Sequence, residues 1–207
     1  WSALRKYKYW EGEIWNRKKN GELYIQLSTI TAIDNVEGDT IEYIALFSDI
    51  TEIKGHEDQL QKMAHYDALT GLPNRVLFND RLQLAIETAK HDQKKVALLF
   101  IDLDRFKEIN DSFGHNAGDE ILKTVSQRLK NIIGEKDTVS RLGGDEFSII
   151  VEGVDKAEDV SILAKKILNV LSQEIMLDDN TLYISTSIGI SMFPGDGGSS
   201  QNLLKYA

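Results

Sequence analysis

Two neighbouring carboxylates occur where the chain is predicted to reverse direction. Asp145 and Glu146 directly follow Gly143 and Gly144, and a β-like run lies on each side of these four residues. Only glycine adopts positive φ without steric cost, so the Gly-Gly pair predicts a tight β-hairpin. Carboxylates on an uncrowded turn suit a hard cation such as Mg²⁺, which takes few protein oxygens beside water and phosphate oxygens. The alternative is a solvated acidic hairpin.

A third carboxylate, Asp102, ends the most apolar run of the chain, residues 96–101. A continuous apolar run predicts a central strand that is buried on both faces. Asp102 would then stand at the carboxyl end of that strand, where ligands gather in mixed α/β sheets. If the hairpin neighbours this strand, Asp102 and Asp145 converge from different strands and form a hard-metal site.

Two further residues downstream of Asp102 carry groups that can read a purine edge. The Asn110 amide offers a donor and an acceptor, whereas an ionised Asp119 only accepts. A carboxylate that faces N1–H and the exocyclic amine selects guanine over adenine, because adenine has no donor at N1. Each residue also has a plain structural interpretation, Asn110 as a turn former and Asp119 as an acid in the first turn of a helix.

Composition limits the class of protein. A chain of 207 residues with 42% hydrophobic and 28% charged residues predicts one or two globular domains with a substantial core. The net charge of −9 argues against non-specific nucleic-acid binding. An acidic domain that handles a polyphosphate also needs metal ions to offset the repulsion.

The sequence also bears on the compartment. Without cysteine there are no disulfides and no thiolate metal sites, which fits a reducing compartment such as the cytoplasm. The most apolar run is too short to span a bilayer, so we expect no membrane contact by this stretch. The chain has neither an initiator Met nor a signal-peptide core, which predicts a piece of a longer protein that could itself be membrane-anchored.

The elements that would position the candidate residues follow residue 66. Helical periodicity predicts helices over about 76–91, 117–133, 156–172 and 200–207. Strands are predicted over 95–101, on both sides of the Gly-Gly turn, and as one run over 182–192. The polar stretch 105–116 is rich in turn formers and predicts a loop. Together these elements predict an α+β fold, with helices flanking a central sheet.

The first 50 residues predict a separate antiparallel sheet. Three β-like runs, over 8–16, 22–33 and 40–50, include a hairpin at Asn20-Gly21. A three-stranded sheet with one apolar face needs a covering layer, which this stretch does not contain. Thr51 can cap a helix that runs to about residue 65. That helix is either a solvated linker or a rod that transmits dimer register.

Residues 13–22 and 47–51 resemble the C-terminal half of a PAS sensory domain. The Asp-Ile-Thr ending, residues 49–51, is typical of PAS domains that feed an output domain. The helices and early strands that complete a PAS ligand pocket are absent from these residues. We therefore infer no ligand for this part.

The rest of the chain, from about residue 64, resembles GGDEF-domain diguanylate cyclases. Four motifs carry the resemblance in the family's order and spacing, at Asp67–Arg75, Phe100–Asp119, Arg141–Phe147 and Ser187–Ser191. The resemblance implies a nucleotide-cyclase (palm or ferredoxin-like) sheet flanked by helices. The expected organisation is a partial PAS domain over 1–51, a linker helix over 52–65 and a GGDEF domain over 66–207.

The resemblance implies a reaction that needs two copies of the domain. Two domains would face each other, each holding one GTP with Mg²⁺, or with Mn²⁺ as an alternative, and together make cyclic di-GMP and two pyrophosphates. The metal would be held by the carboxylates and the carbonyl of Asp102, Asp145 and Leu103. Glu146 would support metal binding or deprotonation of the attacking 3′-hydroxyl. Asn110 and Asp119 would hold guanine.

The resemblance also implies how the phosphates are bound. They would lie along backbone N–H groups, those of Arg105, Phe106 and Lys107. Gly143 and Gly144 would let the substrate come close. In the family a Lys and an Arg beyond the closing helix grip the phosphates, and neither is present here. This chain is therefore expected to bind GTP weakly and to turn over slowly or not at all.

A second departure concerns product inhibition. Many relatives carry an Arg-x-x-Asp site before the hairpin, and here Asp137 fits it but Gly134 stands at the Arg position. Glycine cannot make the bidentate contacts of such a site, so we expect no feedback inhibition there.

One alternative function stays open. The amino-acid sequence of residues 67–75 is common in proteins in which a phosphodiesterase domain follows the GGDEF domain. This GGDEF domain could therefore bind GTP and regulate such a domain without synthesising cyclic di-GMP. An adenylyl or guanylyl cyclase on this scaffold would need different base-reading residues.

Overall fold

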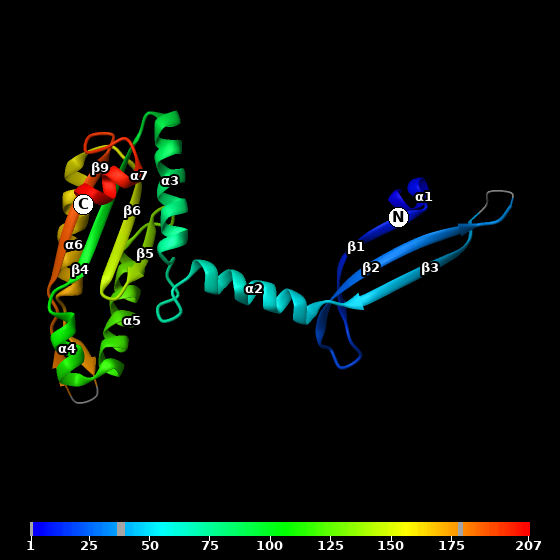
Figure 1. Ribbon diagram of the computed structural model, residues 1–207, viewed down its shortest axis with the longest axis horizontal. Helices are drawn as coiled ribbons and strands as arrows, with labels where there is room; N and C mark the ends of the chain where they lie inside the picture. The colour runs from blue at the N-terminus through cyan, green and yellow to red at the C-terminus, as the bar shows by residue number, and fades with distance from the viewer. Residues whose placement is uncertain (1, 37–39, 178–179) are drawn as a thin grey trace. The chain divides into compact units, whose positions relative to one another are not determined.

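The structure is a computed structural model that describes residues 2–36, 40–177 and 180–207. The chain divides into two compact units, residues 1–62 and 63–207, and each is described by itself (Figure 1). No helix of the described residues is long and apolar enough to cross a membrane.

The first unit contains the predicted three-stranded antiparallel sheet. Its strands β1 (Tyr9–Arg17), β2 (Leu23–Asp34) and β3 (Thr40–Asp49) lie in that order. Gly21 has φ +91°, as expected for the predicted hairpin turn. A short helix, α1 (Ser2–Tyr7), was not predicted; it precedes β1 and buries Leu4.

A single helix, α2 (Thr51–His65), follows the sheet and begins one residue before the predicted linker helix over 52–65. The predicted role of Thr51 as its cap is wrong. Thr51 is the first helical residue, and its N–H donates to the Asp49 carboxylate at 3.0 Å. The Thr51 hydroxyl oxygen accepts from the Ile25 N–H at 2.9 Å instead, which ties the start of α2 to β2.

The second unit has the predicted α+β architecture. Its four-stranded sheet has the order β5-β6-β4-β9, and every neighbouring pair is antiparallel. The strands are β4 (Lys95–Leu103), β5 (Thr138–Gly143), β6 (Glu146–Val154) and β9 (Thr186–Phe193). The main helices are α3 (Arg75–Asp92), α5 (His115–Ile132), α6 (Ala157–Leu171) and α7 (Ser200–Tyr206).

Strand β4 is buried on both faces, as its apolar run predicts. Successive side chains of a strand point to opposite faces. Ala97, Leu99 and Ile101 therefore pack in one core with residues of α5 and α6. Val96 and Leu98 pack in the other with residues of α3 and α7. Two cores fix β4 in the centre of the sheet and with it the position of Asp102.

Two predicted elements differ from the structure. The stretch 105–116 is not a loop: it contains α4 (Phe106–Phe113) and the start of α5. Its polar residues conceal a short amphipathic helix that Phe106 and Ile109 attach to the core. The run 182–192 is not one strand either. β8 (Asn180–Leu182) pairs with β7 (Ile175–Leu177) in a separate sheet, and β9 begins only at Thr186.

Candidate active site

The Gly-Gly turn joins β5 and β6 in the tight hairpin that the sequence predicts. Gly143 pairs with Glu146 across the ladder, so Gly144 and Asp145 form the turn. Gly143 and Gly144 have φ values of +148° and +53°. A side chain is strained at such angles, and no neighbouring atom lies within 4 Å of a Cβ built at either glycine. The approach to Asp145 is therefore open.

Asp102 lies at the same edge of the sheet as the two hairpin carboxylates. In the β-ladders Asp102 is the partner of Glu146 on β6 and of Ser187 on β9. Partial burial and the charges of Asp145, Asp104 and Glu146 raise the pKa of the Asp102 carboxyl above its ordinary value. The edge thus carries a concentration of negative charge that a cation would relieve.

The donor set fits a metal that keeps other ligands. Among the described residues, no group of three or more His, Asp or Glu side chains is arranged to hold a metal ion. Mg²⁺ does not need such a group, since it is usually bound by one or two carboxylates together with waters and substrate phosphates. Leu103, whose carbonyl was predicted as a further ligand, is the buried last residue of β4.

The start of α4 lies directly after this acidic edge. Arg105 precedes the helix with φ +57° and ψ +24°, a left-handed conformation, and its side chain does not cap the helix. No residue of the described chain accepts a hydrogen bond from the N–H groups of Phe106 and Lys107. Free N–H groups at a helix N-terminus attract anions, and phosphate is the usual one.

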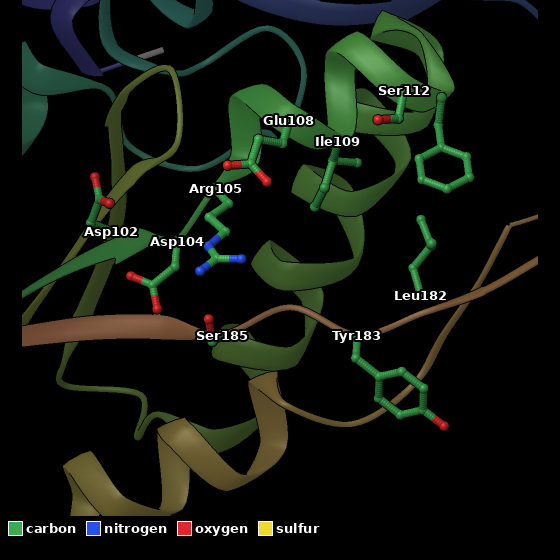
Figure 2. Close-up of a pocket in the computed structure, with 10 residues that line it drawn as sticks. Asp102, Asp104, Arg105, Glu108, Ile109, Ser112, Leu182, Tyr183 and Ser185 are labelled. Carbon is green, nitrogen blue, oxygen red and sulfur yellow. The ribbon is translucent and has the colours of Figure 1, made fainter.

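A cavity of about 870 Å³ opens beside this helix start. Figure 2 shows Asp102, Asp104 and Arg105 at one end, with Leu182 at the other. The pKa of Asp104 is lowered by hydrogen bonds with Ser185 and Ser187. Asp104 was not among the predicted site residues, although its position two residues after Asp102 is a usable signal.

Asn110 and Asp119 lie where α4 meets α5, outside the lining of that cavity. The Asn110 side chain rests on Gly118, and a Cβ at Gly118 would collide with its amide. This close packing brings the Asn110 amide beside the residue that precedes Asp119. Gly114, with φ +83°, makes the turn between the two helices.

Arg141 connects the hairpin to the loop before α3, a link that the sequence does not reveal. Its Nη1 donates to both Asp67 carboxylate oxygens, at 2.9 and 3.0 Å. Its Nε and Nη2 donate to the Gly144 carbonyl oxygen, at 3.0 and 2.7 Å. Burial raises the pKa of Asp67, but hydrogen bonds from Thr70 and Arg141 outweigh it, and the pKa lies below its ordinary value.

A second arginine contacts the hairpin from the first turn of α3. Arg75 Nη2 lies 3.1 Å from a Glu146 carboxylate oxygen, and its Nε donates to the Leu142 carbonyl oxygen at 3.3 Å. Both side chains are solvent-accessible, so the ion pair adds little stability. It orients the Glu146 carboxylate beside the Asp102 strand.

Comparisons with known proteins identify the family of the second unit. Residues 64–207 match a family model described as "Diguanylate cyclase, GGDEF domain". Two similar proteins from Pseudomonas aeruginosa are the cyclic di-GMP phosphodiesterase NbdA and the bifunctional diguanylate cyclase/cyclic di-GMP phosphodiesterase MucR. NbdA is 40% identical over 148 residues, which cover 72% of this chain and 19% of NbdA. MucR is 42% identical over 146 residues, which cover 70% of this chain and 21% of MucR.

Solved structures resemble the second unit. The GGDEF domain of TpbB (YfiN) from Pseudomonas aeruginosa is 40% identical and superimposes with a TM-score of 0.66, over 68% of this chain and 83% of that one. The chain spans about a fifth of the length of NbdA and MucR, so it corresponds to one part of such proteins.

Proposed function

The chain belongs to the GGDEF-domain family of diguanylate cyclases, and we propose that it condenses two GTP molecules into cyclic di-GMP and two pyrophosphates, as the output domain of a PAS-regulated signalling protein. One observation carries the proposal. Asp102 and Glu146 are ladder partners, with Asp145 one residue away, directly beside the free N-terminus of α4. Carboxylates for a metal and N–H groups for phosphates thus lie together.

Asp102, Asp145 and the Leu103 carbonyl would hold Mg²⁺, with Mn²⁺ as an alternative. These residues would thereby place a cation that, when bound, would lower the pKa of the attacking 3′-hydroxyl and offset charge on the α-phosphate. The raised pKa of Asp102 supports this role, because crowded carboxylates gain most from a cation. Glu146, oriented by Arg75, would accept the 3′-hydroxyl proton or support the metal.

The nucleotide would lie between the hairpin and α4. The backbone N–H groups of Arg105, Phe106 and Lys107 would bind the terminal phosphates at the positive end of the helix dipole. Gly143 and Gly144 leave the space that the substrate needs.

Asn110 and Asp119 would hold the guanine base. The Asn110 amide and an ionised Asp119 together match the donors and the acceptor on the guanine edge. Gly118 supports this pair, because the Asn110 side chain occupies the space where any larger residue would place its Cβ.

The reaction would need a homodimer. Each chain supplies one GTP, so each 3′-hydroxyl must attack a nucleotide held by the other copy. A monomer would bind GTP without completing the reaction.

The similarity to NbdA and MucR favours one alternative function. Their names describe phosphodiesterase or bifunctional proteins, so this domain could hold GTP and regulate an attached phosphodiesterase domain without synthesis. Both functions place the site in the cytoplasm, where GTP is available.

The test uses the full-length natural protein with GTP and Mg²⁺, and measures cyclic di-GMP by chromatography. Synthesis is expected in the wild type and is expected to disappear in Asp145→Ala. Asp80→Asn, on the exposed surface of α3, is the control. GTP binding without product in the wild type would support the regulatory alternative instead.

A further inference from the structure

The turn that joins β4 to α4 contains only Asp104 and Arg105. Arg105 makes so short a turn possible because its backbone adopts the left-handed conformation, with φ +57° and ψ +24°. A residue with a side chain is strained there, and such strain persists only where neighbouring contacts over-determine the conformation. The contacts of the preceding residue, Asp104, supply this constraint.

Asp104 is fixed by two hydrogen bonds, one to the residue just before β9 and one to β9 itself. Its backbone N–H donates to the Ser185 carbonyl oxygen at 3.0 Å. Its carboxylate accepts from the Ser187 hydroxyl at 2.8 Å, and Ser187 is itself the ladder partner of Asp102. Figure 2 shows Asp104 between Asp102 and Ser185. The backbone and the side chain just before Arg105 are therefore both held.

The conformation of Arg105 decides where the following N–H groups point. A left-handed residue followed by helical residues turns successive N–H groups to one side and forms a concave anion site, called a nest. Helical Arg105 would instead change the direction of the chain between β4 and α4, and with it the direction of these groups relative to Asp102. Hence the left-handed conformation of Arg105 sets the direction in which this anion site opens.

We propose that Asp104, held by Ser187, is a positioning residue of the phosphate site: it locks Arg105 in the left-handed conformation that aims the N–H groups of residues 105–107 at the substrate. The inference rests on the proposed function in naming GTP as the substrate and the N–H groups of residues 105–107 as its phosphate site. It assigns Asp104 no contact with substrate or metal. It also gives a physical role to Ser187, which lies in the fourth sequence motif.

The first experiment measures binding to the full-length protein by calorimetry with two probes in Mg²⁺. The first probe, 3′-deoxy-GTP, carries three phosphates and no nucleophile, and the second, GMP, lacks the terminal phosphates. Asp104→Ala and Ser187→Ala are expected to weaken 3′-deoxy-GTP binding at least about tenfold, the loss that displaced hydrogen bonds to an anion produce. GMP binding is expected to change less than about twofold.

Two variants serve as controls for the hydrogen bond itself. Ser191→Ala removes another serine hydroxyl from β9, one that lies four residues beyond Ser187 and donates to the Leu203 carbonyl oxygen at 2.8 Å. It is expected to leave both affinities unchanged. Asp104→Asn keeps an oxygen acceptor for Ser187 and is expected to retain most of the 3′-deoxy-GTP affinity. Equal losses for both probes in Asp104→Ala would overturn the proposal.

The second experiment separates backbone positioning from every other effect of Asp104. Arg105→Gly and Arg105→Ala are each added to Asp104→Ala. Both remove the same guanidinium, but only glycine enters the left-handed region without strain. The glycine double variant is expected to bind 3′-deoxy-GTP several-fold more tightly than the alanine double variant. Equal affinities would overturn the proposal.

Cyclic di-GMP formation is measured in parallel and tests the proposed function separately. Absence of product in the wild type, with the predicted binding pattern intact, would refute synthesis and leave the positioning role supported. Product formation with unchanged 3′-deoxy-GTP binding in Asp104→Ala would refute the positioning role alone. A wild type that binds neither probe would refute both.

Discussion

Arg141 and Asp67 form a two-pronged ion pair across 74 residues of sequence. Their side chains are only 11% and 22% exposed. The same guanidinium donates to the Gly144 carbonyl oxygen. One side chain therefore ties the turn that carries Asp145 to the loop that precedes α3.

Arg141→Lys is expected to lower the free energy of unfolding by about 2 kcal/mol, because an ammonium cannot bond both Asp67 oxygens and the Gly144 carbonyl together. Catalytic turnover is expected to fall at least about tenfold, since the hairpin loses its tether. Urea denaturation and product formation measure the two effects. Arg81→Lys, whose parent side chain donates to Thr138 Oγ1 at 3.2 Å, is the control. A wild-type rate in Arg141→Lys would contradict the prediction.

The same pair predicts a pH dependence of stability. The pKa of Asp67 is lower in the folded chain than its ordinary value of about 3.9. Its ionised form thus contributes stability that is fully present above that value and is lost as the pH falls through the lower folded value. The stability difference between wild type and Asp67→Asn is expected to be constant at neutral pH and to shrink in acid.

Urea titrations between neutral pH and strong acid check this dependence. The exposed Asp80→Asn variant on α3 is the control, measured at the same pH values. A difference between wild type and Asp67→Asn that stays constant into strong acid would show that the ionised pair contributes nothing.

Gly118→Ala is expected to weaken GTP binding about fivefold to tenfold. The new Cβ on α5 would displace the Asn110 amide, which extends from α4 and packs against Gly118. Gly55→Ala, in α2, is the matched control, since no atom lies within 4 Å of its Cβ. Gly55→Ala is expected to raise the free energy of unfolding by about 1 kcal/mol, because alanine has a higher helix propensity than glycine. Equal gains in stability with unchanged GTP affinity in both variants would refute the role of Gly118.

Asp102→Asn is expected to raise the melting temperature by about 2 °C in the presence of EDTA. Burial and three neighbouring carboxylates disfavour the ionised Asp102 at neutral pH, and the amide removes that charge. Mg²⁺ with 3′-deoxy-GTP is expected to stabilise the wild type but not the variant. Thermal unfolding with and without Mg²⁺ measures both effects, and equal stabilisation of the two proteins would rule out Asp102 as a metal ligand.

Asp137→Ala is expected to leave any inhibition by cyclic di-GMP unchanged. The Asp137 carboxylate accepts a hydrogen bond from the Glu152 N–H at 3.0 Å, and its neighbour Gly134 has no side chain to join it on a ligand. Initial rates at increasing product concentration provide the measurement. Micromolar inhibition that disappears in Asp137→Ala would contradict the expectation.

The parts of this protein that the sequence alone determined are those whose cause is local. The Gly143-Gly144 turn depends on positive φ at the glycines themselves, and the burial of β4 depends on its own apolar run. The motifs likewise identified the family before any geometry was known. Each of these features can be predicted because it needs no distant partner.

Tertiary structure alone decided the features that join distant segments. The stretch 105–116 has the composition of a loop, but it contains the helix α4. Phe106, the first residue of that helix, is buried, and Asp104 just before it is hydrogen-bonded to Ser185 and Ser187. The pairs Arg141–Asp67 and Arg75–Glu146 join residues more than 70 positions apart. No local propensity encodes such pairs, because each partner is favourable only where the packed sheet brings the other within hydrogen-bond distance.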